Sequence, residues 1–287
     1  MKNCFVSFLF LILSSGTIFS QKDLQVTYLA NEGFLLRTSS HKVLIDALFK
    51  DGYGAFAVPP KETLQQIMEM KAPFDSIDIY MLTHYHKDHC DAEMVQTYIK
   101  KHPEIPLVTN KPSLVFIDGV CFGFVQLTKQ FREMTPAINE SVSETIKGIS
   151  VKAFGLKHLS FIKNEIDLEE YMMNTAYLFE MDGIKIFHSG DIKLNALQDY
   201  IAKHKKWTDK IDIAFLYYEL LYQGDADLEL ILKTLHPKQI VLMHIPPKKN
   251  ELWKANIEKM KVKFPDIRFF AVPMETQTFH FENNSNQ

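Results

Sequence analysis

The chain has 287 residues, of which 46% are hydrophobic and 23% charged, and its formal net charge at pH 7 is −3. This composition is typical of a globular protein with a sizeable core. The charge speaks against a nucleic-acid partner, which usually needs a basic face, and the densest basic run (202–207) suits a solvated helix face better. Three cysteines, one of them at position 4, exclude a disulfide-rich framework.

The first twenty residues differ from the rest of the chain. Lys2 precedes an apolar run over 5–12, small residues follow, and the sequence turns polar at Gln21. This order is typical of a secretory signal peptide (1–20) cleaved near Ser20. The alternative is a membrane anchor, but the run is short and interrupted, and a spanning helix takes about 20 apolar residues. We therefore expect a periplasmic or secreted protein without a stable membrane anchor, whose single domain covers 21–287.

Short apolar runs separated by turn residues open the mature chain at 24–29, 33–37 and 42–46, and they predict an antiparallel meander. Helical spacing follows at 61–71, a strand at 77–82, a second helix at 91–101 and a short buried strand at 106–109. Residues 111–150 are the least readable segment, for which an inserted lid and a helical excursion are the two interpretations.

The second half of the chain alternates strands with helices. Strands are expected at 151–154, 175–181, 184–188, 211–216, 239–244 and 268–272, and helices at 194–205, 226–235 and 251–264. We see no tandem repeat and no low-complexity linker. The pattern predicts one domain with its strands in two groups and helices outside both groups.

The stretch THYHKDHC, residues 83–90, carries three histidines and an aspartate within six residues. His84, His86 and Asp88 alternate, so they project to the same side of an extended segment, and His89 begins the turn into the next helix. Imidazole and carboxylate bind zinc and similar ions. The loop can offer ligands to two adjacent ions but completes neither site, because a catalytic zinc usually has about three protein ligands and an open position.

Candidates for the remaining ligands follow predicted strands later in the chain. His158 comes after the strand at 151–154, Asp191 ends the sequence HSGD, and His244 ends the strand at 239–244. A lone histidine is more often structural or exposed, so it is the complete first motif that favours a ligand role for His158 and His244. His188 still belongs to its strand, and we expect it to support the site or the core rather than bind an ion.

With these motifs in this order, nearly the whole mature chain resembles the metallo-β-lactamase-fold hydrolase superfamily. The resemblance rests on the meander ending in Asp46, the His-x-His-x-Asp-His motif, the later histidine, the Gly-Asp pair and the final histidine. It implies an α/β fold, a four-layer αββα sandwich of two mixed β-sheets with helices on the outer faces. It also implies two ligand sets and a bridge between them: His84, His86 and His158 for one ion, Asp88, His89 and His244 for the second, and Asp191 for both.

The early meander and the sequence KIFHSGD are most similar to the branch that contains ascorbate-6-phosphate lactonase and many uncharacterised hydrolases. A bridging aspartate is typical of relatives such as glyoxalase II, lactonases and phosphodiesterases, whereas true β-lactamases place cysteine or serine there or lack the bridge. Redox relatives usually have glutamate in place of the second histidine of the first motif, where this chain has His86. We therefore expect a hydrolase of small-molecule esters or lactones.

Two divalent ions a few ångströms apart can share one water and lower its pKa from about 15.7 towards neutrality. The expected cofactors are two ions, with Zn²⁺ first and Mn²⁺ or Fe²⁺ as alternatives, and the expected nucleophile is a hydroxide that bridges them. Asp88 and Asp191 would be the catalytic carboxylates, and Asp88 would orient the hydroxide and carry a proton. A phosphodiesterase with the same metal site and a non-catalytic metal-binding module are the competing interpretations, and the oligomeric state stays open.

Other residues near these motifs have structural interpretations as well. Gly190 would let the chain turn so that Asp191 faces the ions. Asp46 would either accept a hydrogen bond from a ligand imidazole or stabilise a buried turn, and Cys90 is expected to be a buried thiol. Residues 171–173 would either line an apolar substrate wall or pack beneath a loop. The remaining histidines are expected to be exposed, namely His41, His102, His204, His236 and His280.

Overall fold

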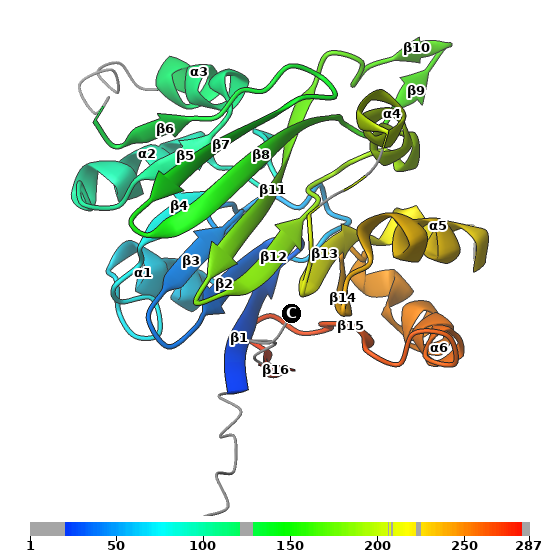
Figure 1. The fold of residues 1–287 in the computed structure, drawn as a ribbon. Helices are drawn as coiled ribbons and strands as arrows, with labels where there is room; N and C mark the ends of the chain where they lie inside the picture. Colours follow the sequence, from blue (N-terminus) through cyan, green and yellow to red (C-terminus); the bar gives the residue numbers. More distant parts are fainter. Residues whose placement is uncertain (1–20, 121–128, 206, 208, 222–224, 283–287) are drawn as a thin grey trace, which may run out of the picture.

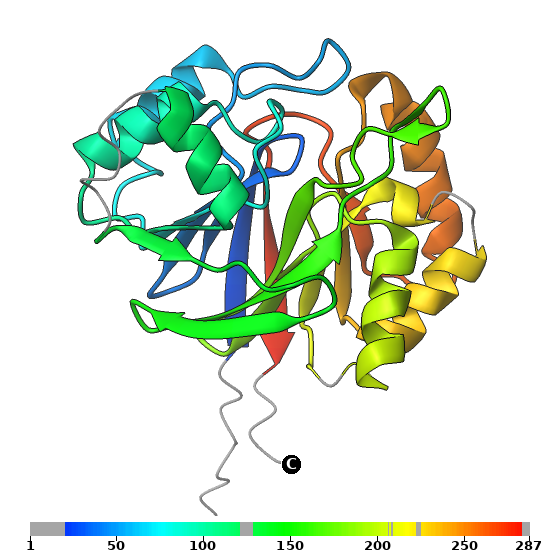
Figure 2. The ribbon, with the colours of Figure 1, turned by 90° about the horizontal axis from the view of Figure 1, so that it is seen from above.

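The computed structural model describes residues 21–120, 129–205, 207, 209–221 and 225–282 (Figure 1). Two seven-stranded sheets pack face to face. Seen from above, helices α1 to α3 cover the outer face of one sheet and α4 to α6 cover the other (Figure 2). The predicted four-layer αββα fold is confirmed. The predicted signal peptide lies outside the described residues.

The first sheet is built from the amino-terminal half of the chain and the last strand. Its strand order is β16-β1-β2-β3-β4-β5-β6, with antiparallel pairing from β16 to β3 and parallel pairing from β3 to β6. The strands are β1 (Gln21–Ala30), β2 (Gly33–Arg37), β3 (Lys42–Ile45), β4 (Ile79–Met81), β5 (Leu107–Thr109), β6 (Phe131–Glu133) and β16 (Thr276–Glu282). Its helices are α1 (Lys61–Met68), α2 (Ala92–Lys101) and α3 (Lys111–Val120).

The second sheet has the strand order β15-β14-β13-β12-β11-β8-β7, and its strands β12 to β15 are parallel. The strands are β7 (Ser141–Ile146), β8 (Ile149–Lys157), β11 (Met173–Met181), β12 (Ile184–His188), β13 (Ile213–Tyr217), β14 (Gln239–Met243) and β15 (Ile267–Phe269). The helices on this side are α4 (Leu194–His204), η2 (Tyr218–Leu221), α5 (Asp225–Leu235), η3 (Pro247–Lys249) and α6 (Asn250–Met260). A separate hairpin of β9 (Ile162–Lys163) and β10 (Ile166–Asp167) projects from the body.

The central strands, such as β2, β12, β13 and β14, are buried on both faces, which is why their sequences are almost continuously apolar. Along β2, Phe34 and Leu36 belong to the apolar layer between the sheets, whereas Leu35 packs on the helix side. This alternation follows from the two-residue period of a strand. Helix α2 begins where the Asp91 carboxylate accepts the Met94 N–H at 3.0 Å, which satisfies a free amide of its first turn.

Several boundaries differ from the sequence-based expectation. Within 111–150, the structure shows the helix α3 and the strands β6 and β7, so the segment completes both sheets; 121–128 lie outside the described residues. The strand expected at 268–272 is β15, which ends at Phe269. Strand β16 was not predicted, because it is an edge strand with only Phe279 and Phe281 buried. None of the described helices is long and apolar enough to cross a membrane.

Candidate metal centre

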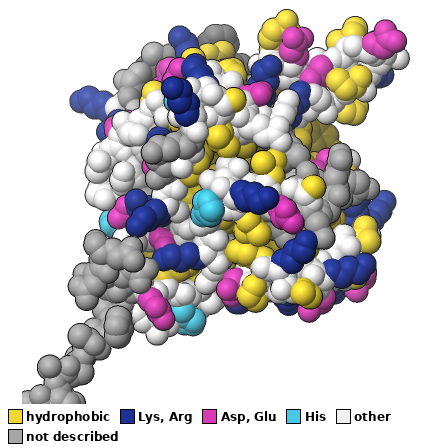
Figure 3. Space-filling view, turned by 45° about the vertical axis from the view of Figure 1, so that its right-hand side comes forward, with side chains coloured by type: hydrophobic (Ala, Val, Ile, Leu, Met, Phe, Trp, Pro, Cys, Tyr) yellow, Lys and Arg dark blue, Asp and Glu magenta, His cyan; other side chains and the backbone are white. Residues whose placement is uncertain are grey.

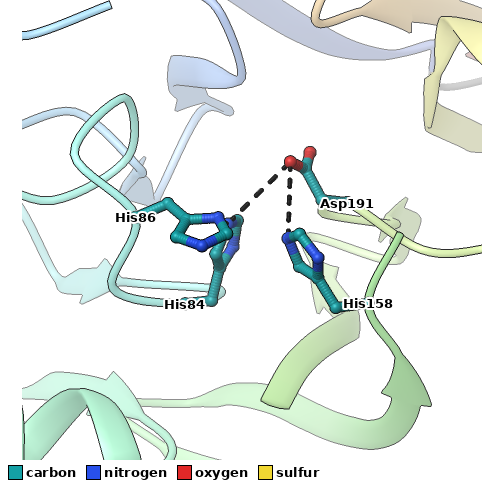
Figure 4. Close-up of side chains that lie close together, drawn as sticks. All are labelled: His84, His86, His158 and Asp191. Carbon is teal, nitrogen blue, oxygen red and sulfur yellow. Dashed lines mark hydrogen bonds and ion pairs between the residues drawn. The ribbon is translucent and has the colours of Figure 1, made fainter. Parts of the chain in front are cut away.

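All seven predicted ligands meet at one edge of the sandwich, between the two sheets. Each follows the end of a strand: the motif 84–89 follows β4, and the other three follow β8, β12 and β14. The possible ligand atoms of His84, His86, His158 and Asp191 all lie within 4.8 Å of one another, and those of Asp88, His89 and His244 form a second such group. Six of the seven residues are buried, and His86 is partly exposed. Figure 4 shows the first group.

The Asp191 carboxylate lies at the centre of both groups. Its Oδ2 is 3.9 Å from His84 Nε2 and 3.6 Å from His158 Nε2 (Figure 4). The same oxygen is 3.7 Å from His89 Nε2 and 3.3 Å from His244 Nε2. One carboxylate oxygen thus faces four imidazoles that come from both sheets. Asp191 therefore lies within reach of the histidines of both groups.

The backbone around Asp191 explains its position. Gly190 has φ +55°, and a Cβ there would lie 2.3 Å from Asn174 Oδ1, so glycine is needed for the turn. The Asn174 side chain then accepts the Asp191 N–H at 3.2 Å and donates to the Ser189 carbonyl at 2.9 Å. The turn predicted at Gly190 is confirmed.

Outer partners fix the orientation of the two fully buried histidines of the motif. The Asp46 carboxylate accepts His89 Nδ1 at 3.0 Å, the Thr83 N–H at 2.8 Å and the Thr83 hydroxyl at 2.6 Å. Because the Thr83 hydroxyl donates to Asp46, it accepts from His84 Nδ1, which lies at 3.0 Å. Both imidazoles therefore direct Nε2 towards Asp191. Of the two roles considered for Asp46, the structure shows a hydrogen bond from a motif imidazole.

The other histidines are oriented by different elements. His158 Nδ1 donates to the Leu159 carbonyl at 2.9 Å, which leaves its Nε2 free. His86 is turned the other way: its Nδ1 lies 3.1 Å from His84 Nε2, and its Nε2 lies 3.2 Å from the Glu169 carboxylate. In His158 and His86, the ring nitrogen that faces away from the site contacts an oxygen, which fixes the orientation of the ring.

His244 reaches the site through an uncommon backbone conformation. Its φ is +61°, a region that non-glycine residues seldom occupy, and its N–H donates to the Asn31 carbonyl at 3.3 Å. The Asn31 side chain donates to Asp88 Oδ2 at 3.0 Å, and Asp88 Oδ2 lies 3.2 Å from His244 Nε2. Asn31 therefore joins two members of the second group.

Buried charges are balanced within the site. Burial lowers the pKa of His84 well below its usual value, so this imidazole is neutral. Burial also lowers the pKa of His244, but the Asp191 carboxylate outweighs it and raises that pKa to about 10. Burial raises the pKa of Asp191, yet His244 and then His89 outweigh it and hold the pKa well below its usual value. The carboxylates of Asp88 and Asp191 thus create a strong preference for positive charge beside them.

The residues fit divalent cations. Among the described residues, five buried atoms of the seven candidate ligands have no hydrogen-bond partner, namely His89 Nε2, His158 Nε2, both ring nitrogens of His244 and Asp191 Oδ1. Buried polar atoms are rarely left unpaired, because each costs about 1–3 kcal/mol. These are nitrogen and oxygen donors of the kind that zinc and similar ions prefer.

Sequence reasoning missed some of the residues around the site. Glu32 is fully buried near His89, with its Oε2 4.0 Å from His89 Nδ1, and burial raises its pKa well above the usual value. Polar residues in a tight turn between two buried strands were the available signal for Asn31 and Glu32. Glu169 lies in a stretch of ordinary surface composition, and nothing in the sequence connects it with His86.

The remaining predictions have mixed outcomes. His188 is fully buried and its Nε2 donates to the Glu32 carbonyl at 3.1 Å; it belongs to neither ligand group. Cys90 is buried, as expected, and burial raises the pKa of its thiol. The expectation that His102 is exposed was wrong: it is 8% exposed, and its Nε2 donates to the Met68 carbonyl. His41 is only partly exposed, because it lies against Asp78.

Comparison with known families matches residues 25–244 to the β-lactamase superfamily domain. The chain therefore belongs to this superfamily, and its fold is the metallo-β-lactamase fold, as the motifs indicated. The predicted class, a metal-dependent hydrolase, follows from this membership. A search of curated protein sequences finds no match.

Solved structures with the same architecture are distant in sequence. A candidate metal-dependent hydrolase from Parabacteroides distasonis is 17% identical, with a TM-score of 0.56 over 88% of this chain and 99% of its own. Igni18, a metallo hydrolase from Ignicoccus hospitalis, is 18% identical, with a TM-score of 0.55 over 90% of this chain and 99% of its own. YhfI, a metallo-β-lactamase fold protein from Bacillus subtilis, is 12% identical, with a TM-score of 0.55 over 90% of this chain and all of its own. At these identities the likeness concerns the fold alone.

Proposed function

We propose that the protein is a hydrolase that binds two divalent ions, with zinc preferred, and cleaves small-molecule carboxylic esters or lactones. The observation that carries the proposal is the position of Asp191 Oδ2, within 3.3–3.9 Å of four imidazole nitrogens from both sheets. Seven candidate ligands are too many for one tetrahedral ion. Two ions with a shared carboxylate use all seven.

In this proposal His84, His86 and His158 would hold one ion, Asp88, His89 and His244 would hold the other, and Asp191 would be a ligand to both. Bound ions supply an activated water and polarise the bond to be cleaved. The water oxygen adds to the acyl carbon, the bond from that carbon to the leaving oxygen breaks, and an acid and an alcohol result. Asp88, which Asn31 holds through a hydrogen bond of 3.0 Å, would orient the water, accept its proton and pass that proton to the leaving oxygen.

Metal content and turnover test this proposal together. Protein purified without chelator should contain two ions per chain by elemental analysis. It should hydrolyse members of a panel of esters and lactones in preference to thioesters, β-lactams and bis-aryl phosphodiesters. A reproducible content below one ion per chain, not restored by added zinc, manganese or iron, would contradict the metal assignment. Preferred turnover of phosphodiesters would replace the ester assignment with the phosphodiesterase alternative.

We also propose export to the periplasm or beyond the cell. The support is the order of residues 1–20: a basic start, an apolar middle and a small residue before Gln21. Sequencing the amino terminus of protein recovered from its native host should find Gln21 or a neighbouring residue. An intact Met1 in a cytoplasmic fraction would rule this out.

A further inference from the structure

Exposed apolar side chains gather on the segments that border the candidate metal centre. Fourteen large apolar side chains are exposed among the described residues, and nine of them lie on three such segments. These nine are Tyr53, Val58, Val115, Phe116, Phe161, Ile162, Ile166, Leu168 and Tyr171. A concentration of exposed apolar surface usually marks a site that binds a ligand, another protein or a membrane.

Two of the three segments contact the ligand residues or the loop that carries them. In the loop between β3 and α1, the ring of Phe56 lies 4.1 Å from the ring of His244, and the Tyr53 hydroxyl accepts the Lys87 N–H at 3.4 Å. On α3, Phe116 stacks on Tyr85 with ring centroids 5.0 Å apart. Tyr85 stands between His84 and His86 in the sequence. This apolar surface therefore adjoins the site itself.

The third segment, residues 160–171, contains the β9–β10 hairpin, and we call it the flap. Tyr171 is 92% exposed, so it does not pack beneath a loop. In Figure 3, hydrophobic side chains interleave with acidic ones at the projecting corner formed by this hairpin. The base of the flap is fixed, because the Asp167 carboxylate accepts the Ser160 hydroxyl at 2.6 Å and the Phe161 N–H at 3.0 Å. Glu169 then connects the flap to His86.

A pocket of about 370 Å³ adjoins both the base of the flap and the site. Ser160 and Lys193 line it, and both contact Asp167 of the flap. Leu159, which follows His158, and Tyr217, whose ring lies 5.0 Å from that of His244, line it as well. This volume is within the usual range for a small-molecule site, roughly 300–1,000 Å³.

We propose that the flap and this pocket bind the hydrocarbon arm of the substrate, the acyl chain of a carboxylic ester or lactone. This inference rests on the proposed function. A stably bound partner protein would cover all three apolar segments and the candidate metal centre that they border, whereas the substrate has to reach that centre. Burial of each methylene adds about 0.8 kcal/mol, a factor of about four.

A series of p-nitrophenyl esters from acetyl to decanoyl, each kept monomeric, tests the inference. The kcat/KM of the wild type should rise by up to about fourfold per methylene over the first part of the series. A triple variant should reduce the gain in kcat/KM per methylene by about half; its substitutions are Phe161→Ser, Ile162→Ser and Ile166→Ser. Val262→Ser with Val272→Ser is the matched control, because these side chains are 87% and 63% exposed away from the flap. The control should keep the wild-type chain-length dependence.

Binding of the alkanoate series, measured by calorimetry, separates this inference from the proposed function. Affinity that rises with chain length in the wild type and not in the flap variant supports the inference, even if no ester is hydrolysed. Hydrolysis of all chain lengths at one rate overturns the inference and leaves the proposed function standing. Two further results would also overturn it: a dimer that the flap substitutions dissociate, or binding to phosphatidylcholine vesicles that they abolish, with chain-length dependence unchanged. The occupant would then be a second copy or a lipid surface.

Discussion

Two carboxylates hold the outer nitrogens of motif histidines, and they do so in contrasting surroundings. Asp46 follows β3, is fully buried, and accepts hydrogen bonds from His89 and from both the backbone and the side chain of Thr83. Glu169 stands on the flap, its side chain is 21% exposed, and it lies 3.2 Å from His86. The same pairing of carboxylate and imidazole thus occurs once inside the sandwich and once at its edge.

This contrast separates two roles that an outer partner can have. A buried carboxylate with three donors is part of the fold, because its loss leaves those donors unpaired away from water. A carboxylate at the edge can be replaced by water, so its loss affects the imidazole and little else. We therefore expect substitutions on the buried side of the site to lower the free energy of unfolding. Substitutions on the flap side should change metal affinity and leave the free energy of unfolding nearly unchanged.

The largest effect should come from Asp191, whose carboxylate faces histidines from both sheets. Asp191→Ala removes the carboxylate shared by the two proposed ions and exposes them to mutual repulsion. We expect loss of at least one ion and a fall in kcat greater than the roughly 100-fold typical of an outer partner. Elemental analysis, circular dichroism and turnover measure the result. A folded Asp191→Ala protein with two ions and near-normal kcat would refute the shared-ligand assignment.

Asp46→Ala tests whether the buried carboxylate stabilises the fold. Three donors lose their acceptor, so the free energy of unfolding should fall by about 3 kcal/mol or more, even in the presence of a chelator. Denaturant unfolding measures this fall. Asp23→Ala is the control, because Asp23 pairs with His280 at the surface, where such pairs contribute about 1 kcal/mol or less. If Asp46→Ala is as stable as the control, the buried network does not support the fold.

Glu169→Ala should behave differently. We expect a 10–100-fold loss of affinity for one of the two ions, measured by competition with a chelating dye, because His86 loses its orienting partner. The unfolding free energy of chelated protein should change by less than about 1 kcal/mol. Glu170→Ala, at the exposed neighbouring position, should leave metal affinity at the wild-type value. Equal affinities in the two variants would mean that Glu169 does not hold His86 for metal binding.

The contrast between the two carboxylates also marks what the sequence could predict. The alternation of His84, His86 and Asp88 is local, and it indicated a metal site without any knowledge of the fold. Asp46 was noticed because it ends a strand of the early meander. Glu169 could not be found in this way, because it meets His86 only after the chain has crossed from one sheet to the other.

The same limit applies to the fold. Strands buried on both faces, such as β12 and β14, were placed closely because their apolar runs are continuous. Strand β16 was missed because its stability comes from pairing with β1, from Thr276 opposite Thr27 to Glu282 opposite Gln21. Such pairing has no signature in a segment that is mostly exposed.

An effect confined to acid conditions should be seen in the pH dependence of stability, through His188 behind the buried side of the site. Its Nε2 donates to the Glu32 carbonyl and its Nδ1 accepts the Gly190 N–H at 3.3 Å, so both nitrogens are satisfied when the ring is neutral. Burial lowers the pKa of His188 to about 4, against about 6.5 for an unfolded histidine. Between pH 4 and pH 6.5, His188 is protonated in the unfolded chain and neutral in the folded protein. This contribution to stability is therefore complete above pH 6.5 and is lost as the pH falls towards 4.

His188→Gln keeps a donor for the Glu32 carbonyl and removes the titration. In chelated protein, the loss of unfolding free energy between pH 6.5 and 4 should therefore be smaller in the variant, by an amount on the order of 3 kcal/mol at the acid end. Denaturant unfolding at a series of pH values gives both curves, and their difference cancels the titration of groups that the two proteins share. Parallel curves would show that His188 is protonated as readily in the folded protein as in the unfolded chain. The neutral imidazole would then not contribute to the stability of the buried side of the site.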